Sequence, residues 1–382
     1  MDDLPHDVLV HTLLFIGKGH HRYISTISTK LHAAYAIVNE PHHRNVTTMK
    51  SVVSSPSCVE MYLIDSEGED GSDAKLHSVL KAAARYGRIN ILEWAFKSKY
   101  SYYAWYYEDT FISAVVHGQL EALKWLHEHG CSLDDGCEYG YGCEYVKGAC
   151  SGAAHGGHLE ILQWLRANDF PWNSRTCEEA AKGGFLEVLK WARINNCPWH
   201  AGTCEAAASG GNLEILQWLR ENNCPWNAWT CEEAAKGGYL EVLKWARTNG
   251  CSWNAWTCFA AACGGQLEVI KWARTNGCPW RTETCFAAAR GGHLEVLEWA
   301  IENGCPHDEL TLKYAAKEAV KMGNISYLNW LKEQGCHFDK EIYRCAADGG
   351  HVEVLEWLRA NERRVDNNAC VNWMRNMCAR LF

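Results

Sequence analysis

The sequence predicts an all-α fold, an α-solenoid of stacked helix-turn-helix repeats, from three observations. One 27-residue unit occurs five times in succession between residues 170 and 304. Each copy holds two short segments with helical apolar periodicity, and a Gly-Gly pair separates them. A unit this short cannot bury its own apolar face, so we expect the copies to stack and share one continuous core.

The copy at 224–250 shows how each helix is predicted. Thr230 stands three residues before Glu233, a spacing that indicates a helix N-cap with a reciprocal capping acid. The first helix then ends at Gly237-Gly238, because glycine readily adopts the left-handed conformation that closes a helix. The second helix, YLEVLKWARTN, has one apolar stripe with a 3.6-residue period, and Asn249-Gly250 ends the unit with a turn.

This unit resembles the ankyrin repeat. TCEEAAKGGYLEVLKW is similar to the ankyrin pattern T-P-L-H-x-A-A-x-x-G-H-L-E-V-V-x-L-L, with Ala234-Ala235, Gly238 and Leu240-Glu241-Val242 in matching places. The ankyrin unit has about 33 residues, and the shorter unit here lacks the segment that makes the protruding β-hairpin. The resemblance implies a protein-binding array whose first helices line a concave face, without a binding surface built on hairpins.

Composition limits the function classes. The chain has 382 residues, 47% of them hydrophobic, which is typical of a globular protein. The net charge of −9 opposes binding to nucleic acid and favours a basic protein partner. We expect no membrane span and no signal peptide, since no long apolar run exists and the chain opens Met1-Asp2-Asp3. A monomer in the cytoplasm is expected, with the nucleus, or a host cytoplasm for a viral protein, as alternatives.

Cysteine is abundant, with 20 residues, and most of it is locked to the repeat. The favoured interpretation is a small buried side chain in a reduced intracellular protein. A ladder of zinc or disulfide links is the alternative, although the gap within each pair is not a zinc-finger spacing. We therefore expect no metal and no cofactor. The thirteen repeat-locked cysteines are Cys131, Cys150, Cys177, Cys197, Cys204, Cys224, Cys231, Cys251, Cys258, Cys278, Cys285, Cys305 and Cys336.

The tryptophan of the second helix measures the length of each repeat. Its position on the apolar stripe predicts a core residue. The spacing rises from 27 to 39 residues between Trp125 and Trp164, which predicts an insertion near 134–146, and to 31 between Trp299 and Trp330. The array is expected to span 45–360 with about ten or eleven repeats, followed by a capping helix at 361–382. A further pair, Trp229 and Trp256, occurs in only two copies, so the fold does not require them.

Residues 1–44 do not belong to the array. Leu4-Pro5-His6-Asp7-Val8-Leu9 and Leu13-Leu14-Phe15-Ile16 resemble the opening of an F-box, although Gly17 to His21 replaces its usual acidic loop. The resemblance implies docking on the adaptor subunit of a cullin–RING ubiquitin ligase. A helical hairpin that only caps the first repeat is the alternative. The implied adaptor-binding residues are Leu4, Pro5, Val8, Leu9, Leu13 and Phe15.

Partner specificity is expected where the copies differ while the frame stays constant. Three columns flank the first helix, and the first of them changes from acidic to aromatic along the chain. The alternative is drift on a solvated face. The predicted partner-binding residues from these columns are Glu178, Lys182, Phe185, Glu232, Lys236, Tyr239, Phe259, Phe286, Arg290 and His293.

Catalysis is not expected. No nucleophile, base and orienting group occur together outside the repeat register, and the Gly-Gly pairs recur at helix ends, unlike a phosphate loop. His155, His293 and His351 lie beside those pairs, where the ankyrin resemblance implies local hydrogen bonding. The favoured function is substrate recognition for a ubiquitin ligase. The alternatives are a scaffold with no ligase link and a viral host-interaction protein, because similar arrays are multiplied in microalgae and in large DNA viruses of protists.

Overall fold

A computed structural model of the chain describes residues 53–54, 72–97, 108–130 and 142–361. Every regular element in these ranges is a helix, so the predicted all-α fold is confirmed. The chain divides into two compact units, 1–199 and 200–382. The F-box-like segment at 1–44, the capping helix predicted beyond Asn361 and most of the insertion lie outside the described residues. The last part of the insertion, from Gly142, is helical, which differs from the loop that the prediction implied.

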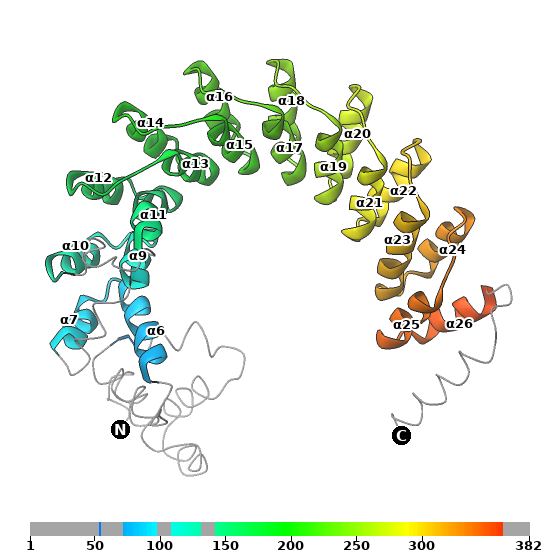
Figure 1. The fold of residues 1–382 in the computed structure, drawn as a ribbon, viewed down its shortest axis with the longest axis horizontal. Helices are drawn as coiled ribbons and strands as arrows, with labels where there is room; N and C mark the ends of the chain where they lie inside the picture. Colours follow the sequence, from blue (N-terminus) through cyan, green and yellow to red (C-terminus); the bar gives the residue numbers. More distant parts are fainter. Residues whose placement is uncertain (1–52, 55–71, 98–107, 131–141, 362–382) are drawn as a thin grey trace, which may run out of the picture. The chain divides into compact units, whose positions relative to one another are not determined.

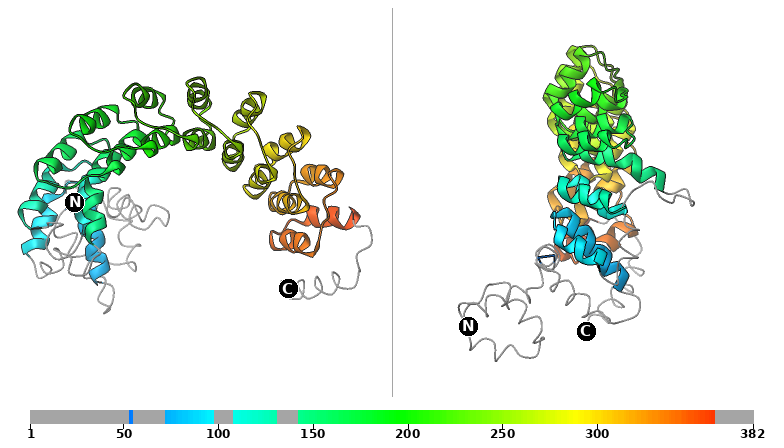
Figure 2. Two further views of the ribbon diagram at one scale, coloured as in Figure 1. Left: turned by 45° about the horizontal axis from the view of Figure 1, so that its top comes forward. Right: turned by 90° about the vertical axis from the view of Figure 1, so that its left-hand side faces the viewer.

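Helices alternate between two roles in each unit. A first helix and a second helix form each repeat, and successive first helices pack on one another in a row (Figure 1). Figure 2 shows the second helices of residues 200–361 forming a row of their own. The helices of the first unit are α6 Ser72–Arg85, α7 Ile89–Lys97, α9 Glu108–Val116, α10 Leu120–Glu128, α11 Gly142–His155, α12 Leu159–Ala167, α13 Ser174–Gly183 and α14 Leu186–Ile194.

The second unit has the more regular repeats. Its first helices are α15 Ala201–Ser209, α17 Ala228–Gly237, α19 Ala255–Cys263, α21 Thr282–Arg290, α23 Glu309–Lys321 and α25 Lys340–Asp348. Its second helices are α16 Leu213–Glu221, α18 Leu240–Thr248, α20 Leu267–Thr275, α22 Leu294–Glu302, α24 Ile325–Glu333 and α26 Val352–Asn361. The longer spacing of 31 residues between Trp299 and Trp330 comes from α23. This helix has 13 residues where α21 has nine, about one helical turn more.

The first helices begin three residues earlier than predicted. Asn227 is the N-cap of α17, and its side-chain oxygen accepts a hydrogen bond from the Trp229 amide at 2.9 Å. Thr230 is therefore a buried residue inside the helix, and the prediction of Thr230 as N-cap with Glu233 as its reciprocal acid was wrong. In α19 the threonine instead reaches back, with its hydroxyl 3.5 Å from the Asn254 amide. Asparagine is the stronger N-cap, which explains the earlier start.

The predicted glycine turn is confirmed. Gly238 closes α17 with φ +79° and Gly184 closes α13 with φ +85°, both in the left-handed region. Where the helix ends one residue sooner, as in α15 and α19, the second glycine of the pair is still the left-handed one. The sharp reversal at this position brings the second helix back against the first.

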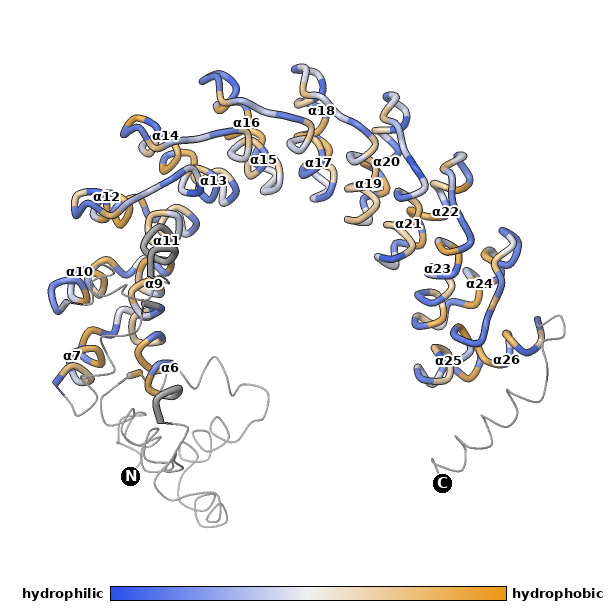
Figure 3. The backbone as a smooth tube through the Cα atoms, in the orientation of Figure 1, coloured by the Kyte–Doolittle hydropathy of each residue, from blue (hydrophilic) through white to orange (hydrophobic). Residues whose placement is uncertain are grey.

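The core of each repeat consists of small and branched side chains. In the repeat at 224–250 it includes Ala234 and Ala235 of α17 with Val242, Leu243 and Ala246 of α18. The connections between repeats are hydrophilic (Figure 3). This division matches the predicted apolar stripe on each second helix.

The tryptophans of the second helices are half-buried, so the prediction that they form the core was wrong. Trp245 meets Trp226 of the preceding loop edge to face, with ring centroids 5.9 Å apart. The indole is too long to remain in the space filled by Val242 and Leu243, and it therefore extends to the edge of the repeat.

An arginine stabilises five of the loops that connect two repeats. The guanidinium of Arg247 lies 4.2 Å from the Trp253 ring centre and donates a hydrogen bond to the Cys251 carbonyl. Four other loops have the same arrangement, with Arg166 on Trp172, Arg193 on Trp199, Arg220 on Trp226 and Arg274 on Trp280. A cation over an indole face and a charged donor on a carbonyl both stabilise the loop.

The predicted role of the repeat-locked cysteines as buried side chains is confirmed for the twelve that the structure describes. All twelve are free thiols. Those of the loops link neighbouring repeats, since the Cys251 thiol donates to the Asn227 carbonyl at 3.2 Å and the Cys278 thiol to the Asn254 carbonyl at 3.4 Å. Burial raises the pKa of Cys150 to about 12, so that thiol stays protonated at neutral pH.

Candidate functional site

Three of the predicted binding residues pack between repeats. Phe185, Tyr239 and His293 are the N-cap residues of α14, α18 and α22. Each side chain lies over the glycine turn of the preceding repeat, so that a Cβ on Gly211 would be 2.5 Å from the Tyr239 ring. The residues of this column therefore vary at a position where neighbouring repeats pack together. Of the three, only Tyr239 is exposed, at 37%.

Histidine in this column adds a hydrogen bond. His293 Nε2 donates to the Cys263 carbonyl at 3.1 Å, and His351 Nε2 donates to the Lys321 carbonyl at 2.9 Å. Local hydrogen bonding by these two histidines is thus confirmed. His155 occupies a different position, with its Nδ1 3.0 Å from the Glu179 carboxylate.

The acidic members of the first column connect one first helix to the cap of the next. The Glu205 carboxylate accepts a hydrogen bond from the Asn227 side chain at 3.0 Å. One repeat later, the corresponding Asn254 side chain acts on Glu232 and lowers the pKa of its carboxyl. Glu178 of α13 is likewise half-buried. These acids therefore contribute to contacts between repeats and also lie on the outward face of the first helices.

Glu232 has an unusual electrostatic environment. Burial raises the pKa of its carboxyl, the nearby Glu233 and Glu205 carboxylates raise it further, and only the Asn254 hydrogen bond opposes them. Its Oε1 atom is buried and has no hydrogen-bond partner among the described residues. A negatively charged group is thus held close to two others without a compensating cation.

Aromatic side chains follow these acids along the first helices. Phe259 meets Trp256 edge to face on α19, with ring centroids 5.1 Å apart, and Phe286 meets Tyr314 in the same way at 5.2 Å. Trp229 and Trp256 are 61% and 49% exposed. We call Trp229, Trp256, Phe259, Phe286 and Tyr314 the aromatic strip. Neither tryptophan was among the predicted binding residues, although their presence in only two copies was the signal for an exposed role.

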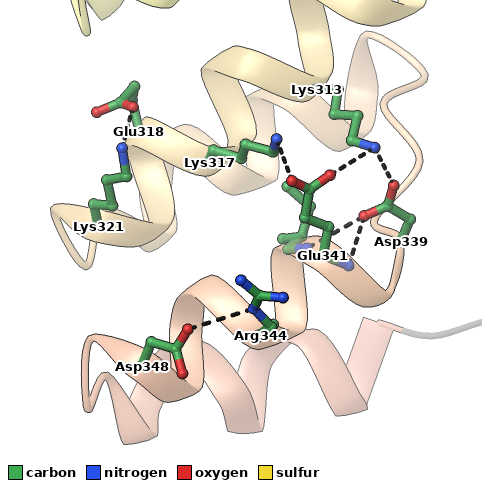
Figure 4. A network of polar contacts seen from close by, with 9 residues as sticks. Lys313, Lys317, Glu318, Lys321, Asp339, Glu341, Arg344 and Asp348 are labelled. Atoms are coloured by element: carbon green, nitrogen blue, oxygen red, sulfur yellow. Dashed lines mark hydrogen bonds and ion pairs between the residues drawn. The ribbon is translucent and has the colours of Figure 1, made fainter.

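Exposed basic residues occur on three of the first helices. Lys182, Lys236 and Arg290 are exposed near the C-terminal ends of α13, α17 and α21. Two further lysines are engaged internally, since Lys313 lies 2.6 Å from Asp339 and Lys317 lies 2.7 Å from Glu341 (Figure 4). These two ion pairs connect α23 to α25. Arg290 is therefore more accessible to a partner than Lys313 or Lys317.

The first-helix face of the second unit, formed by the outward side chains of α15 to α25, therefore combines charged and aromatic side chains. Glu205 and Glu232 lie on α15 and α17, the aromatic strip extends from α17 to α23, and the basic residues Lys236 and Arg290 lie on α17 and α21. Such a surface suits binding, because aromatic and charged side chains supply most of the energy of protein interfaces. Within the described ranges, no three His, Cys, Asp or Glu residues are grouped to hold a metal ion. No helix there has both the length and the apolar character to cross a membrane.

Comparison with known proteins gives structural similarity only. No family model matches the sequence, and no curated protein matches it. The crystal structure of the human ASB11 ankyrin repeat domain is similar at 19% identity and a TM-score of 0.34, covering 41% of this chain and 84% of that one. The pentatricopeptide repeat protein PPR10, in complex with an 18-nucleotide psaJ RNA element, is similar at 15% identity and a TM-score of 0.29. The match covers 93% of this chain and 67% of that one.

Proposed function

We propose that this protein is a binding array without catalytic activity, and that it holds a protein partner on the first-helix face of residues 200–361. The observation that carries the proposal is the exposure of Trp229 and Trp256. Neighbouring repeats have Gly202 and Glu283 at the same helix position and the same fold, so packing does not require an indole there. Exposed indoles flanked by charge are typical of interfaces, where they become buried.

The proposal extends to the N-terminal segment. The F-box resemblance of residues 4–16 supports docking on the adaptor of a cullin–RING ubiquitin ligase, and the array then presents a bound protein for modification. This part rests on the sequence pattern alone. The array and the docking segment are separate claims, so each needs its own experiment.

Partner binding by the array is tested with the double variant Trp229→Ser/Trp256→Ser. Affinity purification of the full chain, quantified by mass spectrometry, is expected to lose its specific partners in the double variant. Ile194→Ser is the matched control, because Ile194 is an apolar side chain of a second helix with 80% exposure. If the double variant folds and retains every partner, the first-helix face is not the binding surface.

Ligase docking is tested by retention of the purified adaptor on the full chain. Leu9→Asp and a chain that starts at Val46 are expected to lose the adaptor, while circular dichroism shows that both keep the helical array. Absence of binding by a well-folded full chain contradicts the ligase role and leaves the binding array unaffected.

A further inference from the structure

Glu232 lies between the two exposed tryptophans of the first-helix face. Trp229 precedes it by three residues on α17, a separation that places both side chains on one face of the helix. On the other side, the Asn254 side chain lies close enough to lower the pKa of Glu232, and the Asn254 oxygen accepts the backbone N–H of Trp256 at 2.7 Å. Glu232 therefore lies on the helix face that carries Trp229 and close to the N-terminal turn of α19, which carries Trp256.

The carboxylate lacks a cation of its own in the part of the chain that the structure describes. Its Oε1 atom is buried and has no hydrogen-bond partner there, and no basic side chain acts on the pKa of the group. The nearest lysine on α17 is Lys236, one turn further along the helix. Its charge favours a lower pKa of the Cys263 thiol on α19. The Glu205 and Glu233 carboxylates increase the local negative charge.

This combination occurs once in the repeats between 170 and 304. One repeat earlier, Glu205 has Trp229 on the following helix but Gly202 on its own. One repeat later, Phe259 replaces the acid. The glutamate flanked by two indoles is thus a feature of α17 and α19 alone, and the repeat frame does not impose it.

We propose that Glu232, Trp229 and Trp256 bind a lysine or arginine side chain in an extended segment of the partner protein. The inference rests on the proposed function, because it assigns one contact of the partner held on that face. A cation is attracted to the electron-rich face of an indole and to a carboxylate at the same time. The loops of the array already pair a cation with an indole, since the Arg247 guanidinium stacks on Trp253 and donates to a backbone carbonyl. The net charge of −9 favours approach of a basic segment.

The test begins with a display library of random short peptides, selected on the full chain. The selected peptides are expected to share a lysine or arginine, and their affinity is expected to fall roughly tenfold in Glu232→Gln. Glu241→Gln is the matched control, since Glu241 is an exposed acid on α18 that is paired with Lys244 at 2.8 Å. Circular dichroism and the unfolding midpoint verify that each variant is folded.

A double-mutant cycle then isolates the contact. Replacing the basic residue of a selected peptide by glutamine is expected to weaken binding to the native chain and to have no further effect on Glu232→Gln. Equal losses in both proteins overturn the cation site. Peptides that depend on Trp229 and Trp256 but not on Glu232 overturn it too, yet preserve the proposed function. Failure to select any peptide sensitive to the two tryptophans contradicts both.

Discussion

His293 Nε2 lies 3.1 Å from the carbonyl oxygen of Cys263, thirty residues earlier in the chain. The bond crosses from one repeat to the next, and the imidazole also covers Gly265. A repeat array derives its stability from such nearest-neighbour contacts. A position that looks like variable surface in the sequence is therefore part of the interface between repeats.

Replacing His293 by alanine is expected to lower the free energy of unfolding by about 1 kcal/mol, the typical worth of one hydrogen bond. His293→Gln is expected to cost less, because Gln266 occupies the same position one repeat earlier, where it covers Gly238 of the preceding repeat and donates to the Gly264 carbonyl of its own turn at 2.7 Å. Urea unfolding followed by circular dichroism measures both variants. Native stability in His293→Ala shows that the bond contributes nothing.

Gly265→Ala is expected to be more damaging than Gly250→Ala. Both glycines have positive φ, +69° and +85°, so alanine at either position costs roughly 1–2 kcal/mol in backbone strain. At Gly265 the new Cβ would also be 2.5 Å from His293 Nδ1, whereas nothing lies within 4 Å at Gly250. The overlap is expected to add about 1–3 kcal/mol.

The double variant Gly265→Ala/His293→Ala provides the control for that explanation. Removing the imidazole is expected to restore part of the stability lost in Gly265→Ala, because the overlap disappears while the backbone strain remains. Equal unfolding midpoints for the single and double variants contradict a clash between the two side chains.

Most of the fold could be predicted from periodicity alone. The spacing of Leu240, Leu243 and Trp245 located the second helix, and Gly237-Gly238 located the turn, because both signals are local. The start of the first helix was missed because Asn227 and Thr230 are both good N-caps, and the sequence does not show which of them hydrogen-bonds. Local sequence signals thus predict the presence of a helix more accurately than the residue at which it begins.

The candidate site was harder to predict because it depends on contacts between repeats. The sequence placed Phe185 and His293 beside the first helix, but their packing over the preceding turn depends on how far neighbouring repeats are separated. Trp245 was assigned to the core because the sequence shows its position on the apolar stripe. The sequence does not show how large a side chain the space between the helices can hold. Trp229 and Trp256 were visible in the sequence, and only their exposure showed that they belong to the face.

Cys263 is expected to react with iodoacetamide in the native protein, whereas the neighbouring Cys258 and Cys285 react only after unfolding. Cys263 is exposed at the end of α19, and the other two are fully buried. The adjoining Cys278 and Cys305 thiols raise the pKa of Cys258 and Cys285, and burial raises it further, so the reactive thiolate is scarce at these two sites. Peptide mapping after pulse alkylation at mildly alkaline pH measures each site. Equal labelling of Cys258 and Cys263 in the folded chain contradicts the buried ladder.

Glu232→Gln is expected to leave the protein as stable as the native chain at pH 7, or slightly more stable. Burial, with the Glu233 and Glu205 charges, raises the pKa of Glu232 above its ordinary value of 4.5 in the folded state. The folded protein therefore binds this proton more tightly than the unfolded chain, so the favourable contribution is complete below pH 4.5 and is lost as the pH rises through the folded-state pKa. Because the side chain is only half-buried and solvent screens its charge, the gain from removing the charge is expected to stay below about 1 kcal/mol. Urea midpoints at neutral and acidic pH measure the difference, which is expected to shrink on acidification, with Glu241→Gln as the control. A clear loss of stability in Glu232→Gln at pH 7 shows that the carboxylate supports the fold, and then a loss of peptide binding in that variant no longer identifies a cation site.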